Sequence, residues 1–119
     1  MLEPVRTSYE TGEPLEWNRV HNLADFVYFD HSIHVQQGVG CESCHGEVDK
    51  MPMMWKEESL QMIWCLECHR EPEKYLRPRE EVFTMGWEPP EPQETLGLRL
   101  LKEHHIQVER LEDCSICHR

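Results

Sequence analysis

The chain has 119 residues, of which 39% are hydrophobic and 29% charged, with eight prolines and a formal net charge of −11. This length predicts a single domain over residues 1–119, and so little apolar content makes a conventional core unlikely to suffice without staples or cofactors. The negative charge argues against a nucleic acid partner, and no apolar run is long enough for a membrane span of the chain's own.

The first forty residues lead to the first cysteine pair. Residues 1–20 are polar and contain Pro4 and Pro14, so we expect an extended lead-in. Residues 27–29, Val-Tyr-Phe, are expected to form a short strand or a packing segment. Gly38 and Gly40 then let the chain reverse directly before the cysteines.

The pentapeptide Cys-x-x-Cys-His occurs three times and uses all six cysteines. Its cysteines and histidines are Cys41, Cys44 and His45, then Cys65, Cys68 and His69, and finally Cys114, Cys117 and His118. This is the attachment signature of c-type haem. Both thiols add to the haem vinyl groups, and the adjacent imidazole becomes the proximal iron ligand. Three copies with no cysteine left over predict three covalently bound haem c groups.

Two other uses of six cysteines compete with this interpretation. A disulfide scaffold suits a short chain, but bridges within such close pairs are strained and leave the adjoining histidines unexplained. Two Cys-x-x-Cys pairs can close one tetrahedral zinc site, but the third pair then needs histidine ligands from elsewhere. A thioredoxin-like motif occurs once, in an α/β pattern, whereas this chain has three copies.

Two helices are predicted between and after the motifs. Residues 55–64 are expected to form a short helix with Leu60, Ile63 and Trp64 turned inward. Leucines at helical spacing make residues 95–105 the best helix candidate of the chain.

The segment between them, residues 77–93, is rich in proline. We expect it to wrap over the surface, with Trp87 holding it in place. Because the haems would supply most of the apolar surface, the predicted fold is mostly irregular with a few short α-helices. It is that of a small multihaem cytochrome c wrapped around three haems.

Five of the eight histidines lie outside the motifs. What fills the second axial position of each haem iron decides between electron transfer and catalysis. His31 and His34 project from one turn, and His34 is close enough to Cys41 to fold back onto the first haem. His31 is then expected to reach the haem of the second motif, so that one turn holds two haems close together.

The distal ligand of the third haem has several candidates. His21 is one, and Met62, just before Cys65, is another, whose thioether would raise the haem potential relative to a bis-histidine site. Ordinary packing in a short helix also explains Met62. His104 and His105 are further candidates, although they end a helix, where cations are favoured, and exposed positions there explain them better.

Phe-x-His-x-x-His followed by Cys-x-x-Cys-His motifs resembles the class III, cytochrome c3-like multihaem cytochromes. Residues 16–21, 25–34, 66–70 and 77–83 are similar to the C-terminal part of the pentahaem cytochrome c subunit of alternative complex III, a bacterial membrane quinol oxidoreductase. That subunit begins with a membrane anchor and two further haem motifs, which do not stand in this sequence. The resemblance therefore implies a truncated or split relative, and implies that His21 serves an upstream haem in the family.

These observations favour an electron carrier over an enzyme. The haems would relay electrons between redox partners, such as iron–sulfur or cytochrome subunits, within a quinol-oxidising complex docked at a membrane, or as a free periplasmic shuttle. An acidic surface suits a basic partner. A small multihaem reductase with an open iron is the rival function. Because c-type haem is attached outside the cytoplasm, we expect a periplasmic or extracytoplasmic location, although no export signal is visible.

Overall fold

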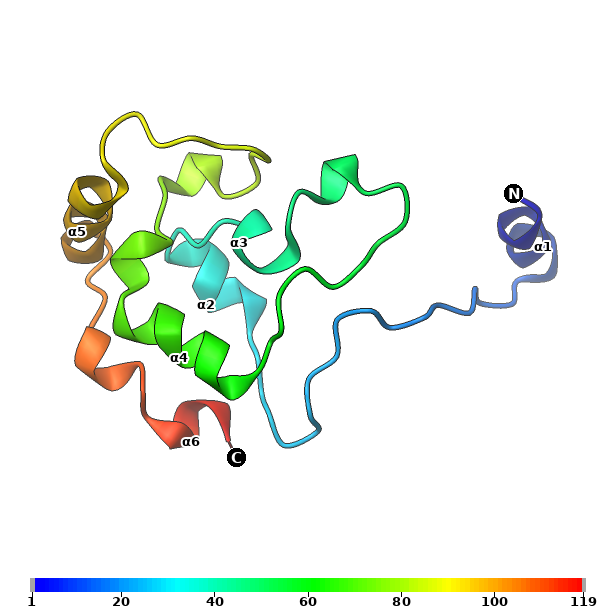
Figure 1. Cartoon of the computed structure of the whole chain (residues 1–119). Helices are drawn as coiled ribbons and strands as arrows, with labels where there is room; N and C mark the ends of the chain where they lie inside the picture. Colours follow the sequence, from blue (N-terminus) through cyan, green and yellow to red (C-terminus); the bar gives the residue numbers. More distant parts are fainter. Residues whose placement is uncertain (1, 119) are drawn as a thin grey trace.

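Figure 1 shows the computed structural model of the chain, which describes residues 2–118. Within them lie six short α-helices: α1 (Glu3–Thr11), α2 (His31–Gln36), α3 (Glu42–His45), α4 (Met62–Arg70), α5 (Gln93–Glu103) and α6 (Cys114–Cys117). Four 3-10 turns join them: η1 (Val48–Lys50), η2 (Pro72–Lys74), η3 (Arg79–Glu81) and η4 (Val108–Arg110). The described residues contain no strand, only an isolated bridge between Val39 and Leu76. The prediction of a mostly irregular fold with a few short helices is confirmed.

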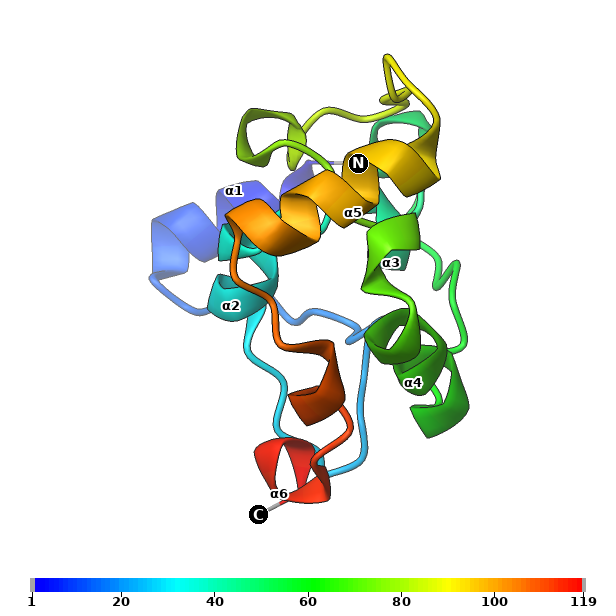
Figure 2. The same ribbon diagram turned by 90° about the vertical axis from the view of Figure 1, so that its left-hand side faces the viewer.

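The helices do not stack in layers. Seen from the side in Figure 2, α2 and α4 lie on opposite sides, with α5 at one end of the molecule and α6 at the other. The helices that carry the cysteine motifs, α3, α4 and α6, are therefore joined mainly by irregular segments. None of the helices in the described part of the chain is both long and apolar enough to cross a membrane.

The apolar core is small and lies between α5 and η2. Leu76 and Leu96 are 1% exposed and Leu100 is 3% exposed, and the three form one cluster. Leu96 and Leu100 are one turn apart, so both face the same side of α5. Gly97 lies beside them, and a side chain there would clash with the Glu73 carbonyl oxygen. Glycine therefore lets α5 pack directly on the backbone of η2.

Helix α5 is the element that the sequence predicted best. The predicted range was 95–105, and the helix occupies Gln93–Glu103. It begins earlier because Pro92 stands at its N-cap, where a missing backbone N–H costs nothing. It ends earlier because His105 has a left-handed backbone, with φ of 55°.

The predicted extended lead-in is wrong for part of its length. Residues Glu3–Thr11 form α1, because Pro4 stands in the first turn, where proline is tolerated, and Gly12 ends the helix with φ of 74°. Residues 12–20 have no regular structure. In Figure 1, α1 stands apart from the other helices at the end of this segment.

The helix predicted over residues 55–64 is also wrong. Leu60 has φ of 54°, a left-handed conformation that an α-helix excludes, and α4 begins only at Met62. Ile63 is 54% exposed rather than turned inward. Residues 27–29 form no strand, but the Tyr28 amide donates a hydrogen bond of 2.8 Å to the Cys117 carbonyl, which agrees with a packing segment.

The proline-rich segment, residues 77–93, connects η2 to α5 and contains η3. Trp87 in it packs against the leucine cluster, and the Arg77 guanidinium lies 4.9 Å from the centre of its ring. That distance is within the range of a cation–π contact. The tryptophan thus joins this segment to the core at one point.

Candidate haem-binding site

Each Cys-x-x-Cys-His motif lies in a helical turn. Cys41 is the N-cap of α3, and its amide donates a hydrogen bond of 3.0 Å to the Val82 carbonyl. The second motif lies within α4, and the third begins α6, where the Asp113 carboxylate caps the helix by accepting from the Ser115 amide at 3.0 Å. Residues four apart share a helix face, so the first two motifs present their first cysteine and histidine together, whereas His118 follows the end of α6 with an extended backbone.

Three of the cysteine thiols have raised pKa values. Burial raises the pKa of Cys44 to about 11 and of Cys68 to about 12, and it also raises that of Cys65. After burial, the charge of Cys65 contributes most to the raised pKa of Cys44. The charge of Cys117 does the same for the pKa of Cys65. These three thiols are therefore protonated at neutral pH.

All six cysteines lie within the described residues, and all six are free thiols. Within residues 2–118, no three His, Cys, Asp or Glu side chains are grouped so as to hold one metal ion. Five of these cysteines are partly buried and Cys114 is exposed, and none is joined to another in a disulfide.

Helix α2 brings its two histidines to two different motif histidines. The His31 ring lies parallel to that of His45, with centroids 6.2 Å apart and planes 9° apart. The His34 ring faces that of His69 at the same centroid distance, 6.2 Å, with planes 25° apart. The Asp30 carboxylate fixes this helix by accepting from the Ser32 amide at 2.8 Å.

This separation fits one metal ion between the rings of each pair. Two imidazoles whose Nε2 atoms point at one metal ion from opposite sides, with metal–nitrogen bonds of about 2.0 Å, have centroids about 6 Å apart. Rings in van der Waals contact would lie closer, at about 4 Å. If haem is bound, His31 with His45 and His34 with His69 would supply the nitrogen ligands of two irons.

The expected pairing of α2 with the motifs is reversed. The sequence placed His34 on the first haem and His31 on the second, but His31 lies opposite His45 and His34 opposite His69. The reason is the orientation of α2. His34 is followed by a reversal at Gly38, where φ is 83° and the Gly38 carbonyl accepts from the Arg77 amide, which turns the chain away before Cys41.

Backbone carbonyls hold three of these rings in one tautomer. The Nδ1 of His34 lies 2.8 Å from the Asp30 carbonyl, that of His69 lies 2.9 Å from the Leu111 carbonyl, and that of His118 lies 3.3 Å from the Phe26 carbonyl. Because a carbonyl only accepts, each Nδ1 carries the hydrogen and leaves the Nε2 lone pair free for a metal.

Burial also favours the neutral form of two of the histidines, His34 and His45. Burial lowers the pKa of His34 below its usual range, and burial followed by the charges of His21 and His31 lowers that of His45. Neutral imidazole is the form that binds metal.

The candidates for the third distal ligand are placed differently from one another. The Nε2 of His21 lies 3.3 Å from the Nδ1 of His45, and the Nδ1 of His104 donates to the Gln37 carbonyl at 2.9 Å. Met62 is the first residue of α4 and is 66% exposed. His105 is exposed after the end of α5.

His118 has Phe26 as its ring neighbour, with centroids 5.8 Å apart. Its Nδ1 lies near the Phe26 carbonyl, and within residues 2–118 no ring contact or hydrogen bond joins it to His21, Met62, His104 or His105.

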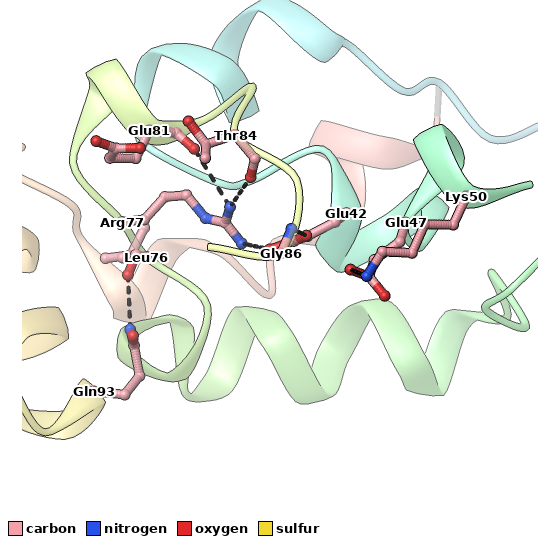
Figure 3. A network of polar contacts seen from close by, with 9 residues as sticks. All are labelled: Glu42, Glu47, Lys50, Leu76, Arg77, Glu81, Thr84, Gly86 and Gln93. Atoms are coloured by element: carbon pink, nitrogen blue, oxygen red, sulfur yellow. Dashed lines mark hydrogen bonds and ion pairs between the residues drawn. The ribbon is translucent and has the colours of Figure 1, made fainter. Parts of the chain in front are cut away.

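A buried ion pair behind the first motif was not predicted from the sequence. Figure 3 shows Arg77 pointing toward Glu42, a residue inside the first motif. The guanidinium donates to the Glu42 carboxylate at 2.7 Å, and the side chains are only 7% and 15% exposed. It also donates to the carbonyls of Glu81 and Thr84, at 3.3 and 3.0 Å. The second Glu42 oxygen accepts from the Gly86 amide at 2.6 Å.

The pair ties α3 to the proline-rich segment and so fixes the turn that carries Cys41–His45. The available signal was an arginine directly before Pro78 in a strongly acidic chain, but sequence spacing does not reveal its partner.

Cys-x-x-Cys-His turns and additional histidines near them are the residue types that bind haem c. The family model described as cytochrome c7 and related cytochrome c matches residues 27–119. The chain therefore belongs to this family of class III multihaem cytochromes, which bind haem c covalently and transfer electrons. No curated protein is similar enough to count as a match.

Proposed function

We propose that the chain binds three haem c groups, one at each Cys-x-x-Cys-His motif, and relays electrons among them as one trihaem domain. The observation that carries this proposal is the pair of histidine rings on α2, each facing a motif histidine at 6.2 Å. Bound haem supplies reversible one-electron iron chemistry. Capped irons on both sides favour electron transfer over substrate binding.

The polypeptide contributes position and environment. One helical turn, capped by Asp30, supplies distal ligands to two sites, which supports close and fixed spacing between the first two haems. The Arg77–Glu42 pair holds the first turn in place. Exposed apolar side chains such as Phe83 and Ile63, at 69% and 54%, are available to pack against haem faces.

For the third haem we propose Met62 as the distal ligand. Met62 begins α4 and stands three residues before Cys65. The charge of Cys117, in the third motif, contributes to the raised pKa of Cys65. The Met62 side chain is largely exposed, so its thioether is accessible to a haem beside it. His21 is engaged elsewhere, through its Nε2.

Replacing Met62 tests this assignment. Met62→Ala should change one haem from low to high spin, and Met62→His should keep it low spin and lower its potential. The ligand charge-transfer band and a spectroelectrochemical titration report both effects. Unchanged spectra and potentials in both variants would remove Met62 from the site.

We further propose a place in a quinol-oxidising respiratory assembly similar to alternative complex III, on the extracytoplasmic side of a membrane. Four sequence segments support it through their similarity to the pentahaem subunit, and the net charge of −11 suits docking to a basic redox partner. The alternative is a free periplasmic shuttle. Fractionation of the source cells separates them: recovery in membranes, released by salt or detergent with other subunits, supports the complex, whereas recovery in the periplasm alone supports the shuttle.

A small reductase remains the rival from a different class. It requires an iron with an open or water-filled sixth position. Carbon monoxide added to the reduced protein distinguishes the two, because capped irons bind it poorly. A large, rapid Soret shift would favour the reductase.

A further inference from the structure

The environment of His45 differs from that of the other motif histidines. Its Nδ1 lies 3.3 Å from the Nε2 of His21, and the two rings meet edge to face, with centroids 4.4 Å apart and planes 77° apart. On its other side lies the parallel ring of His31. His45 thus has two histidine neighbours, His21 through a hydrogen bond and His31 at a centroid distance of 6.2 Å.

His69 and His118 meet the main chain at the same ring position. Their Nδ1 atoms face the Leu111 and Phe26 carbonyls. In the described contacts, His45 differs from both because its Nδ1 partner is a side chain. In the first site, the partner of the motif histidine's Nδ1 is therefore a side chain that can be substituted. In the other two sites it is a backbone carbonyl.

The direction of the hydrogen bond follows from the roles of the nitrogens. If the Nε2 of His45 faces His31 and a metal, its Nδ1 carries the hydrogen and donates it. The Nε2 of His21 must then accept with its lone pair, so that nitrogen is not free to bind a second metal. An acceptor at Nδ1 fixes the ring and makes the bound imidazole a stronger electron donor.

We propose that His21 is a positioning residue for the first haem, acting through His45 rather than as an iron ligand. By accepting the His45 Nδ1–H, it orients the proximal ring and stabilises the oxidised iron, and so lowers the potential of that haem. This inference rests on the proposed binding of haem at Cys41–His45. It replaces both ligand roles considered for His21 from the sequence.

Two substitutions separate the hydrogen bond from the bulk of the side chain. His21→Leu removes the acceptor, whereas His21→Gln keeps one, because the amide oxygen reaches the place of Nε2. Asn22→Leu is the matched control, since Asn22 is an exposed neighbour in the same segment. Each variant is matured with haem, weighed intact, and titrated by spectroelectrochemistry.

We expect His21→Leu to raise the potential of one haem, with three haems attached and all low spin. His21→Gln should lie close to the unsubstituted protein, and Asn22→Leu should be unchanged. Unaltered potentials in His21→Leu would overturn the inference, and so would one high-spin haem, which would make His21 a ligand. Failure of the unsubstituted protein to attach haem would instead overturn the proposed function.

A measurement on the unsubstituted, reduced protein does not depend on variants that fold. ¹⁵N NMR should show a His45 Nδ1–H proton that is shifted downfield and coupled to the Nε2 of His21. A His45 Nδ1–H without that coupling would contradict the proposal.

Discussion

At the scale of single residues, Arg77 and Glu42 matter most for the first motif. Both side chains are nearly buried, and the pair bonds at 2.7 Å. Removing one partner of a buried pair leaves an uncompensated charge, which is far costlier than replacing both. Exposed pairs, by contrast, contribute little.

Arg77→Met is therefore expected to destabilise the haem-loaded protein by about 3–5 kcal/mol, measured by denaturant unfolding followed at the Soret band. Arg99→Met is the control, because the Arg99–Glu91 pair is 52% and 35% exposed. It should cost less than about 1 kcal/mol. The double variant Arg77→Met with Glu42→Gln should recover part of the stability that Arg77→Met loses. Equal losses of stability in Arg77→Met and Arg99→Met would contradict the account.

The Arg77–Glu42 pair also makes the folding stability depend on pH. Burial works to raise the pKa of Glu42, but hydrogen bonds from Arg77 and the Gly86 amide hold it below its usual value. A group with a depressed folded pKa contributes stability above its unfolded pKa and loses that contribution as the pH falls through the folded pKa. The free energy of unfolding, measured from neutral to acidic pH, should thus decline less steeply in Glu42→Gln than in the unsubstituted protein. Parallel curves would show that another group controls the decline.

The motif residues could be predicted from the sequence because their chemistry is contained in five consecutive positions. Their partners could not, because a spacing of three places His31 and His34 on one face without fixing how that face is turned. The structure shows how that face is turned, with His31 near His45 and His34 near His69.

Ligand substitution on α2 tests the observed pairing. His31→Met should raise the potential of the haem bound at Cys41–His45, and His34→Met that of the haem at Cys65–His69, because a thioether favours the reduced iron. NMR contacts from the new methionine methyl group to assigned protons of each motif identify the haem affected. Contacts exchanged between the two variants would restore the pairing expected from the sequence.

At the scale of elements, α5 shows which helices can be predicted. Leucines at helical spacing, a proline at the start and polar residues on the other face all favour the same structure. Residues 55–64 have an apolar pattern too, but Leu60 in a left-handed conformation ends any helix there. A left-handed residue occurs where the chain makes a turn, and the spacing of apolar residues does not predict where that turn is.

The contact between α5 and η2 depends on Gly97. Gly97→Ala improves helix propensity, but its methyl group would clash with the Glu73 backbone, so we expect a loss of about 1–3 kcal/mol from overpacking. Thr95→Ala, at an exposed position of the same helix, should be neutral or slightly stabilising. Thermal unfolding compares the two, and a stabilised Gly97→Ala would show that α5 does not pack closely on η2.

At the scale of the whole molecule, the protein part buries very little apolar surface. The leucine cluster is small, while large apolar side chains such as Met62, Phe83 and Tyr9 are 66%, 69% and 90% exposed. Some of these are expected to lie against haem, whereas Tyr9 belongs to α1, which stands apart in Figure 1. A polypeptide with so small a core is marginal without cofactors.

We therefore expect a variant with all six cysteines changed to serine to lack cooperative unfolding. Its near-ultraviolet circular dichroism should be weak, and its amide protons should exchange rapidly. The haem-loaded protein is the reference. A cooperative transition in the variant would show that the leucine cluster alone is a sufficient core.

The central claim is that each Cys-x-x-Cys-His turn holds one covalent haem. Its most direct test is the intact mass combined with a reduced pyridine haemochrome spectrum, on protein produced in a host that matures c-type cytochromes. The account predicts the mass of the chain plus three haems and a c-type haemochrome band of matching intensity. Zinc or bridged thiols in place of haem, or fewer than three haems on fully matured protein, would contradict it.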